Sequence, residues 1–182
     1  MRSALRLAVL ALLLAAAACG GSGDDSRADE RFAPASMRAV LDTDQPELDC
    51  ELSLEPDGAL AVAVNGPGRL RLFRVDGPGP ESGPESGHDR TMRYEARVAT
   101  RGLASQVYLE LLCHFPDQGT YFSRDLAHKL TGDTDWTVLS TPFYLQADQR
   151  PASFSLNLVL EGAGSGRVLV RDVRLLEAAP PR

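Results

Sequence analysis

The chain has 182 residues, of which 43% are hydrophobic and 24% charged, the balance of an ordinary folded domain. Its 19 Lys and Arg residues stand against 25 Asp and Glu, a formal net charge of −6. That charge argues against a nucleic-acid-binding protein, because binding phosphates requires a basic surface. Three cysteines are too few for a small fold held together by disulfides.

The N-terminus has the features of an export signal. Arg2 and Arg6 precede an apolar run at 7–18, which is shorter than the roughly 20 residues that a membrane-spanning helix needs. We expect a signal peptide at 1–18 and a flexible linker at 19–35, rich in Gly, Ser and Asp. The remaining residues, 36–178, are expected to form one domain.

The alanines before Cys19 resemble the lipobox of bacterial lipoproteins, although Ala16 stands where that family usually has Leu. The resemblance implies that Cys19 is lipidated and anchors the chain to a membrane of the bacterial cell envelope. No Asp follows Cys19, which by the same resemblance favours the outer membrane. If the chain is instead cut at an A-x-A site, the protein is secreted without a lipid.

Beyond the linker, apolar residues alternate with period two rather than with helical periodicity. The clearest example has Phe154, Leu156 and Leu158 on one side of a strand and Ser155 and Asn157 on the other. The expected strands are 37–41, 50–54, 59–64, 69–75, 92–100, 105–115, 137–145, 153–161 and 166–176. About nine strands separated by short turns predict an all-β fold, an antiparallel β-sandwich or jelly roll.

Residues 76–90 interrupt this pattern with two consecutive GPES repeats. Proline cannot donate a hydrogen bond to a β-ladder, so this segment is expected to be a low-complexity loop. A solvent-exposed insertion is favoured over a functional loop, since loop length costs little entropy.

The last third of the chain carries a family resemblance in its glycines, its tryptophan and its final strand. The matching residues are Gly132, Trp136, Gly162, Gly164, Gly166, Val168, Asp172 and Val173. This ending resembles that of galactose-binding-like jelly rolls, which include carbohydrate-binding modules. The resemblance implies the jelly-roll fold, with Trp136 as a structural residue that covers the core. It specifies a fold more than a ligand, since many members bind no sugar.

The same family often holds a structural calcium ion with paired acidic residues near its end. Here the pair reads Arg171-Asp172, so only Asp172 is a candidate calcium ligand. The alternative is a surface aspartate between Arg171 and Arg174.

Cys50 and Cys113 remain after Cys19 is assigned to lipid. In an oxidising compartment they could form one disulfide, or both could be buried thiols that act as small apolar residues. The sequence leaves both interpretations open.

The segment 113–126 is the best local candidate for a ligand site. It groups His114, Tyr121, Phe122 and Arg124 around a Pro-Asp-Gln-Gly turn. Aromatic rings stack on sugar faces and polar groups bond sugar hydroxyls, which makes these four residues candidate ligand contacts. The alternative, which we prefer, is a hairpin whose aromatic residues fill the core.

Motifs for catalysis are absent from the sequence. It contains no H-x-x-H or C-x-x-C metal motif, no G-x-S-x-G elbow and no carboxylates convincingly spaced for glycoside hydrolysis. The sequence therefore predicts a non-enzymatic, envelope-anchored binding module for a glycan or another envelope component, without nucleic acid and without a cofactor other than calcium. The alternatives are a structural or protein-interaction lipoprotein with no sugar ligand and, less favoured, a small jelly-roll lyase or hydrolase.

Overall fold

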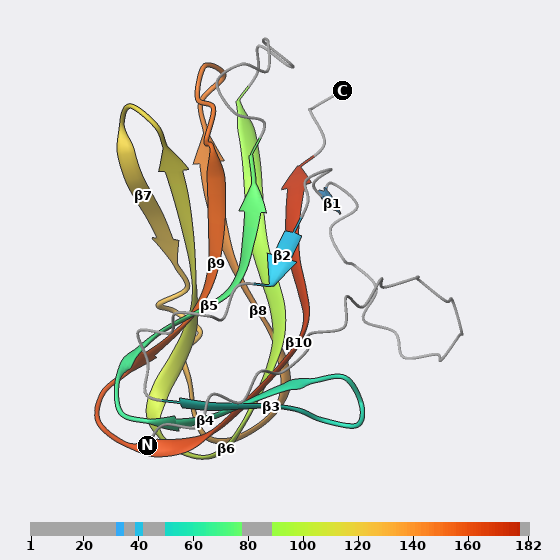
Figure 1. The fold of residues 1–182 in the computed structure, drawn as a ribbon, viewed down its shortest axis with the longest axis vertical. Coiled ribbons are helices and arrows are strands. Elements are labelled where there is room, and N and C mark those ends of the chain that lie inside the picture. Colours follow the sequence, from blue (N-terminus) through green and yellow to red (C-terminus); the bar gives the residue numbers. More distant parts are fainter. Residues whose placement is uncertain (1–31, 35–38, 42–49, 78–88, 179–182) are drawn as a thin grey trace, which may run out of the picture.

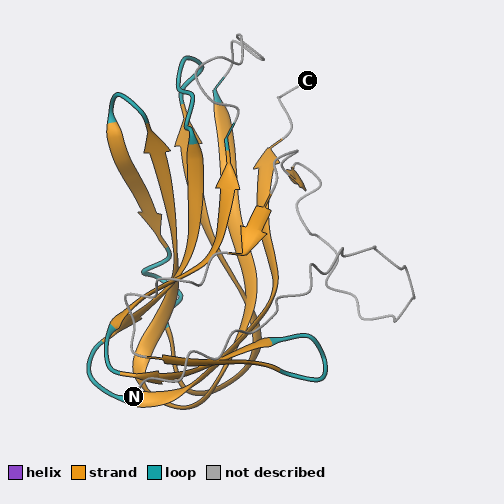
Figure 2. Cartoon of the chain, viewed as in Figure 1, coloured by secondary structure: helices purple, strands orange, loops and turns teal. Residues whose placement is uncertain are grey.

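The computed structural model describes residues 32–34, 39–41, 50–77 and 89–178, in which all regular structure is β-strand (Figure 2). The strands are β1 (Phe32–Pro34), β2 (Ala39–Leu41), β3 (Cys50–Leu54), β4 (Leu60–Asn65), β5 (Gly68–Asp76), β6 (Arg90–Phe115), β7 (Gly119–Arg124), β8 (Leu130–Leu145), β9 (Ser153–Glu161) and β10 (Ser165–Ala178). The signal peptide 1–18, Cys19 and most of the predicted loop 76–90 lie outside the described residues. Within the described ranges, no helix could span a membrane.

Strand β6 belongs to both layers of the sandwich, and every strand pair is antiparallel. Its first half pairs with β8 and β10, and β4 and β3 continue that layer. Its second half pairs with β7 and β9, and β5 and β2 continue the other layer. Figure 1 shows β6 running to one end of the molecule, turning there and returning. The all-β antiparallel sandwich predicted from the sequence is therefore confirmed.

The sequence predicts two strands, 92–100 and 105–115, where the structure has one. Gly102 bends β6 without ending it, since its φ of 55° is a conformation that glycine adopts readily. Its N–H donates to Asp133 Oδ1 at 2.6 Å, and the register with β8 shifts repeatedly around this point. The bend transfers the chain from one layer to the other.

The hydrophobic core lies between the two layers. It includes fully buried side chains from both, among them Leu70, Leu72, Tyr94, Val98, Leu109, Leu111, Phe154 and Leu158. The alternation predicted for 153–161 is confirmed, because Phe154, Leu156 and Leu158 all join this core. Burying such side chains is worth about 1.5–3 kcal/mol each.

Some of the other strand boundaries agree with the sequence-based predictions and some do not. Strands β3 and β9 have the predicted bounds, whereas β7 and the first residues of β8, 130–136, were not predicted as strand. Strand β1 lies inside the predicted linker 19–35, where it pairs with the end of β10. The segment 130–136 has apolar residues only at its two ends, so it lacks the apolar alternation that marks a strand.

Trp136 does not cover the core as predicted. It is half-buried, it is not part of the core cluster, and the Arg171 guanidinium lies 4.1 Å from the centre of its ring. The register of β8 on β6 shifts between Thr134 and Thr137. Such an irregularity changes which face a side chain occupies.

Cys50 and Cys113 are not joined to each other in the structure, so of the two interpretations that the sequence leaves open, the disulfide is not formed. Cys50 pairs with Val64 on β4, and Val64 pairs with Gly166, which approaches Leu103. Cys113 lies ten residues further along β6 than Leu103, or about 33 Å at the rise of a strand. A disulfide requires Cα atoms within about 7 Å.

Candidate ligand-binding face

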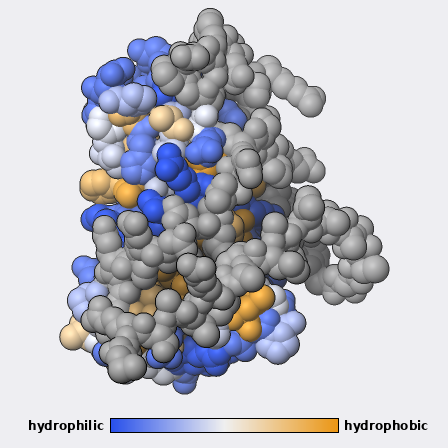
Figure 3. All heavy atoms as spheres, viewed as in Figure 1, coloured by the Kyte–Doolittle hydropathy of each residue, from blue (hydrophilic) through white to orange (hydrophobic). Residues whose placement is uncertain are grey.

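The outer face of the layer formed by β5, β9, the second half of β6 and β7 is unusually polar, and we call it the polar face. The registers place on it Arg69, Arg71, Arg74, Asp76, Glu110, His114, Thr120, Phe122, Arg124, Ser153, Ser155 and Asn157, together with the apolar Leu112 and Val159. Hydrophilic side chains gather on this side of the molecule (Figure 3). Polar residues on central strands are costly unless they are bonded or bind something.

A β-bulge in β5 brings two arginines to the polar face. Arg71 pairs with Asn157 and Arg74 pairs with Ser155, although the two arginines are three residues apart. In a regular strand this odd spacing would place them on opposite faces. The register shift between Arg71 and Phe73 restores both to one face, as bulges commonly do.

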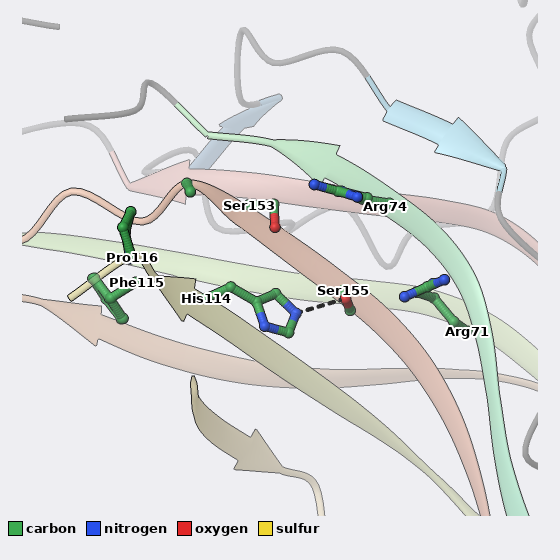
Figure 4. A pocket seen from close by; sticks show the side chains of 8 residues that line it. Arg71, Arg74, His114, Phe115, Pro116, Ser153 and Ser155 are labelled. Carbon is green, nitrogen blue, oxygen red and sulfur yellow. Dashed lines mark hydrogen bonds between the residues drawn. The ribbon is translucent and has the colours of Figure 1, made fainter. Parts of the chain in front are cut away.

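A shallow pocket of about 360 Å³ lies at one end of the polar face. It is lined by Arg71, Arg74, His114, Phe115, Pro116, Ala152, Ser153 and Ser155. Figure 4 shows both arginines reaching from β5 and the imidazole standing opposite them, with the two serines of β9 between. Three strands thus contribute polar groups to one depression.

His114 is held at both ring nitrogens. Nδ1 lies 2.9 Å from Thr120 Oγ1 and Nε2 lies 2.8 Å from Ser155 Oγ. Burial lowers the pKa of His114, and the positive charges of Arg74 and Arg71 lower it further. The imidazole is therefore neutral at pH 7, with one nitrogen donating and the other accepting.

This pKa has a consequence for stability. Unfolded His114 binds a proton near pH 6.5, whereas the folded protein binds it only at lower pH, so the free energy of unfolding should fall as pH drops below about 6.5. We expect His114→Gln to flatten the urea-unfolding profile between pH 6.5 and 5. An equally steep profile in the variant would contradict this origin.

Within the polar face lies an ion network around Glu110, whose side chain is 0% exposed, with two arginines that are each 33% exposed. Arg124 Nε donates to its Oε2 at 2.6 Å, Arg69 Nε lies 2.6 Å from its Oε1, and Asn157 Nδ2 donates to Oε1 at 3.2 Å. The hydrogen bond to Glu110 raises the pKa of Arg124. The network fixes the position of both arginines.

Phe122 offers an aromatic surface beside the pocket. Its side chain is 58% exposed, and the Arg124 guanidinium lies 4.3 Å from its ring centre. It follows Thr120, the partner of His114, by two residues and so shares its face. Because Glu110 holds Arg124, the ring has a fixed support.

The four predicted ligand contacts do not form one site. His114, Phe122 and Arg124 share the polar face, but Tyr121 points to the opposite face, where its ring packs edge-to-face on Phe115 with centroids 5.7 Å apart. Consecutive strand residues alternate in direction, so Tyr121 and Phe122 cannot act together. The alternative interpretation, in which the aromatic residues of this hairpin fill the core, fits Tyr121 only in part, because its side chain is 48% exposed.

Sequence reasoning missed Arg71, Arg74, Ser153 and Ser155. The serines carried a signal, since polar residues alternated with the core residues of 153–161. When a strand lies between two others and still carries polar residues on its outer side, that side is a candidate binding surface. Nothing in the sequence indicated which arginines would lie across from it.

Asp172, the candidate calcium ligand, lies at a register shift of β10 with a φ of 53°. Arg97 Nε and Arg171 Nε are each 3.9 Å from its Oδ2, so its closest charged neighbours are positive. Among the described residues, no cluster of three or more His, Cys, Asp or Glu could hold a metal ion. Calcium at Asp172 stays a prediction.

The Ser155–His114 pair has the spacing of a nucleophile and a general base, but its surroundings suit binding better. Ser155 lies within β9 and pairs on both sides, with Arg74 and Leu112, so nearby backbone N–H groups belong to ladders and cannot hold an oxyanion. The group at Nδ1 is the Thr120 hydroxyl, not a carboxylate.

No protein-family model and no curated protein matches this sequence. Among solved structures, the chain is similar to carbohydrate-binding modules of β-sandwich type, the family its last third resembles. The family 11 module from Clostridium thermocellum in complex with a β-1,3-1,4-mixed-linked tetrasaccharide is 12% identical, with a TM-score of 0.42, over 86% of this chain and 92% of that one.

A structure described as a carbohydrate-binding module of the β-sandwich superfamily is 14% identical, with a TM-score of 0.39, over 80% of this chain. This chain covers 56% of that protein. A family 4 module is 14% identical over 76% of this chain and 84% of its own length, with a TM-score of 0.40. These likenesses are too distant to carry a function across to this chain.

Proposed function

We propose that this protein is a non-catalytic glycan-binding module whose site is the polar face. The observation that carries the proposal is the juxtaposition of the pocket around His114 with the exposed ring of Phe122. Sugars present hydroxyls at their edges and apolar C–H groups on their faces. A site with alternating donors and acceptors beside an aromatic ring matches both.

The hydrogen-bonding groups are positioned before a ligand arrives. His114, Thr120 and Ser155 hold one another in place, and hydroxyls can either donate or accept. Such preorganisation reduces the entropy lost on binding. The neutral imidazole positions these hydroxyls without the cost of burying a charge.

We also propose that the lipid on Cys19 tethers the module to the bacterial envelope. The absence of Asp after Cys19 favours the outer membrane as the site of attachment. An acidic protein is repelled by anionic lipid surfaces, so its attachment would depend on the acyl chains. A structural or protein-interaction lipoprotein is the alternative, and it predicts that no glycan binds the polar face.

The Phe122→Ala variant tests the proposed site. The purified full-length chain is first tested for binding to polysaccharides and peptidoglycan. For each glycan that the wild type binds, we expect the variant to bind at least about tenfold more weakly, because the stacking surface is lost. Tyr144→Ala is the matched control, since Tyr144 is 73% exposed on β8 in the other layer. Equal binding by both variants and the wild type would exclude the polar face as the site.

A further inference from the structure

We propose that the pocket binds a sugar carrying a carboxylate, with the acid group held by Arg74 and Arg71 and the ring hydroxyls by Ser153 and Ser155, the second of which His114 positions. This inference rests on the proposed glycan-binding function and specifies the class of glycan. It concerns the charge of the ligand, which the exposed ring of Phe122 does not determine.

The pocket is a positive site on a negative protein. Two guanidinium groups and no carboxylate are among its lining residues, in a chain whose formal net charge is −6. Glu110, the nearest buried acid of the polar face, is occupied by Arg69 and Arg124. A local positive potential in an acidic surface attracts anionic ligands.

Arg74 is the group best placed to meet a ligand. Its side chain is 54% exposed, and its ion pair with Asp76 spans 3.6 Å between two exposed groups. Such a pair is weak and can be exchanged for a ligand carboxylate. Arg71 makes interactions of its own and contributes chiefly as a second positive charge. A guanidinium can bind a carboxylate through two parallel hydrogen bonds.

The size and the hydroxyl groups favour a sugar over a bare anion. A pocket of about 360 Å³ is at the small end of ligand sites, which range from about 300 to 1,000 Å³. Ser153 and Ser155 lie between the arginines and His114 (Figure 4). A small inorganic anion would reach the arginines but leave the hydroxyls of Ser153 and Ser155 without a ligand group to bond.

The experiment compares matched acidic and neutral glycans. The full-length chain is titrated calorimetrically with oligosaccharides of polygalacturonate, alginate and glucuronan and with their carboxyl-reduced forms, at one ionic strength. We expect at least one acidic form to bind about 10- to 100-fold more tightly than its neutral form. Arg74→Gln should remove that preference, and Asp76→Asn should strengthen acidic binding several-fold by removing a competing carboxylate.

Arg97→Gln is the control, because Arg97 is a similarly exposed arginine on the first half of β6, in the other layer. If neutral forms bind as tightly as acidic ones and Phe122→Ala still weakens both, the glycan function stands and the acidic inference is wrong. If a folded chain binds no glycan of either kind, both fail. Binding of inorganic phosphate that requires Arg74, without any uronate binding, would reassign the pocket to phosphate and overturn the inference.

Discussion

Replacing Glu110 with alanine is expected to lower the free energy of unfolding by about 1.5–3 kcal/mol. The carboxylate is fully buried and contacts Arg69, Arg124 and Asn157. Its removal leaves the guanidinium groups of Arg69 and Arg124, each 33% exposed, without the carboxylate to which they bond. Urea unfolding at pH 7 measures the loss. The Phe122 ring should also become less fixed in position, because Arg124, which lies over it, no longer bonds to Glu110.

Glu161→Ala is the matched control for this effect. Glu161 also pairs with a cation, Lys129, but its side chain is 56% exposed, so its removal should cost no more than about 1 kcal/mol. Similar losses of unfolding free energy in the two variants would show that the burial of Glu110 does not increase its contribution to stability.

Gly166→Ala is expected to destabilise the protein by about 2–5 kcal/mol, from overpacking and backbone strain together. A Cβ at this position would lie 2.6 Å from Leu103 Cα and 2.9 Å from Gly102 O, both backbone atoms that cannot swing aside. Its φ of 157° is also a conformation that side chains disfavour. The close approach of β10 to the bend of β6 therefore requires glycine.

Gly162→Ala separates the two causes. Gly162 has a φ of 91°, but a Cβ there would meet nothing within 4 Å, so only the conformational strain of about 1–3 kcal/mol applies. Thermal or urea unfolding of both variants should rank Gly166→Ala as clearly the more damaging. Equal losses would mean that contact with the bend contributes nothing.

The fold could be predicted from local patterns where alternation was strong. Phe154, Leu156 and Leu158 specified both the strand and its buried side, and the glycines from 162 to 166 specified the following turn. The sequence predicts that one strand ends before Gly102 and another begins after it. A glycine at the end of a strand cannot be told from a glycine at a bend within a strand by sequence alone. Trp136 was misplaced since its face depends on a register shift with a distant strand.

The candidate site could be predicted only in part, for a related reason. His114, Phe122 and Arg124 lie on strands joined by one short turn, so local sequence brings them together. Arg74 reaches Ser155 only through the pairing of β5 with β9 and a bulge within β5. Glu110 lies 41 residues from Arg69. Contacts of this range depend on the register of the whole sandwich, which no short motif encodes.

The central claim is that glycans bind the polar face, and chemical-shift mapping tests it most directly. The ¹⁵N-labelled full-length chain would be titrated with the three soluble acidic oligosaccharides and their carboxyl-reduced forms. We predict the largest shifts at His114, at the amides of 119–124 and at Ser153 and Ser155. Shifts confined to the other layer, around Trp136 and Arg171, or none from a folded chain with any of these oligosaccharides, would contradict the claim.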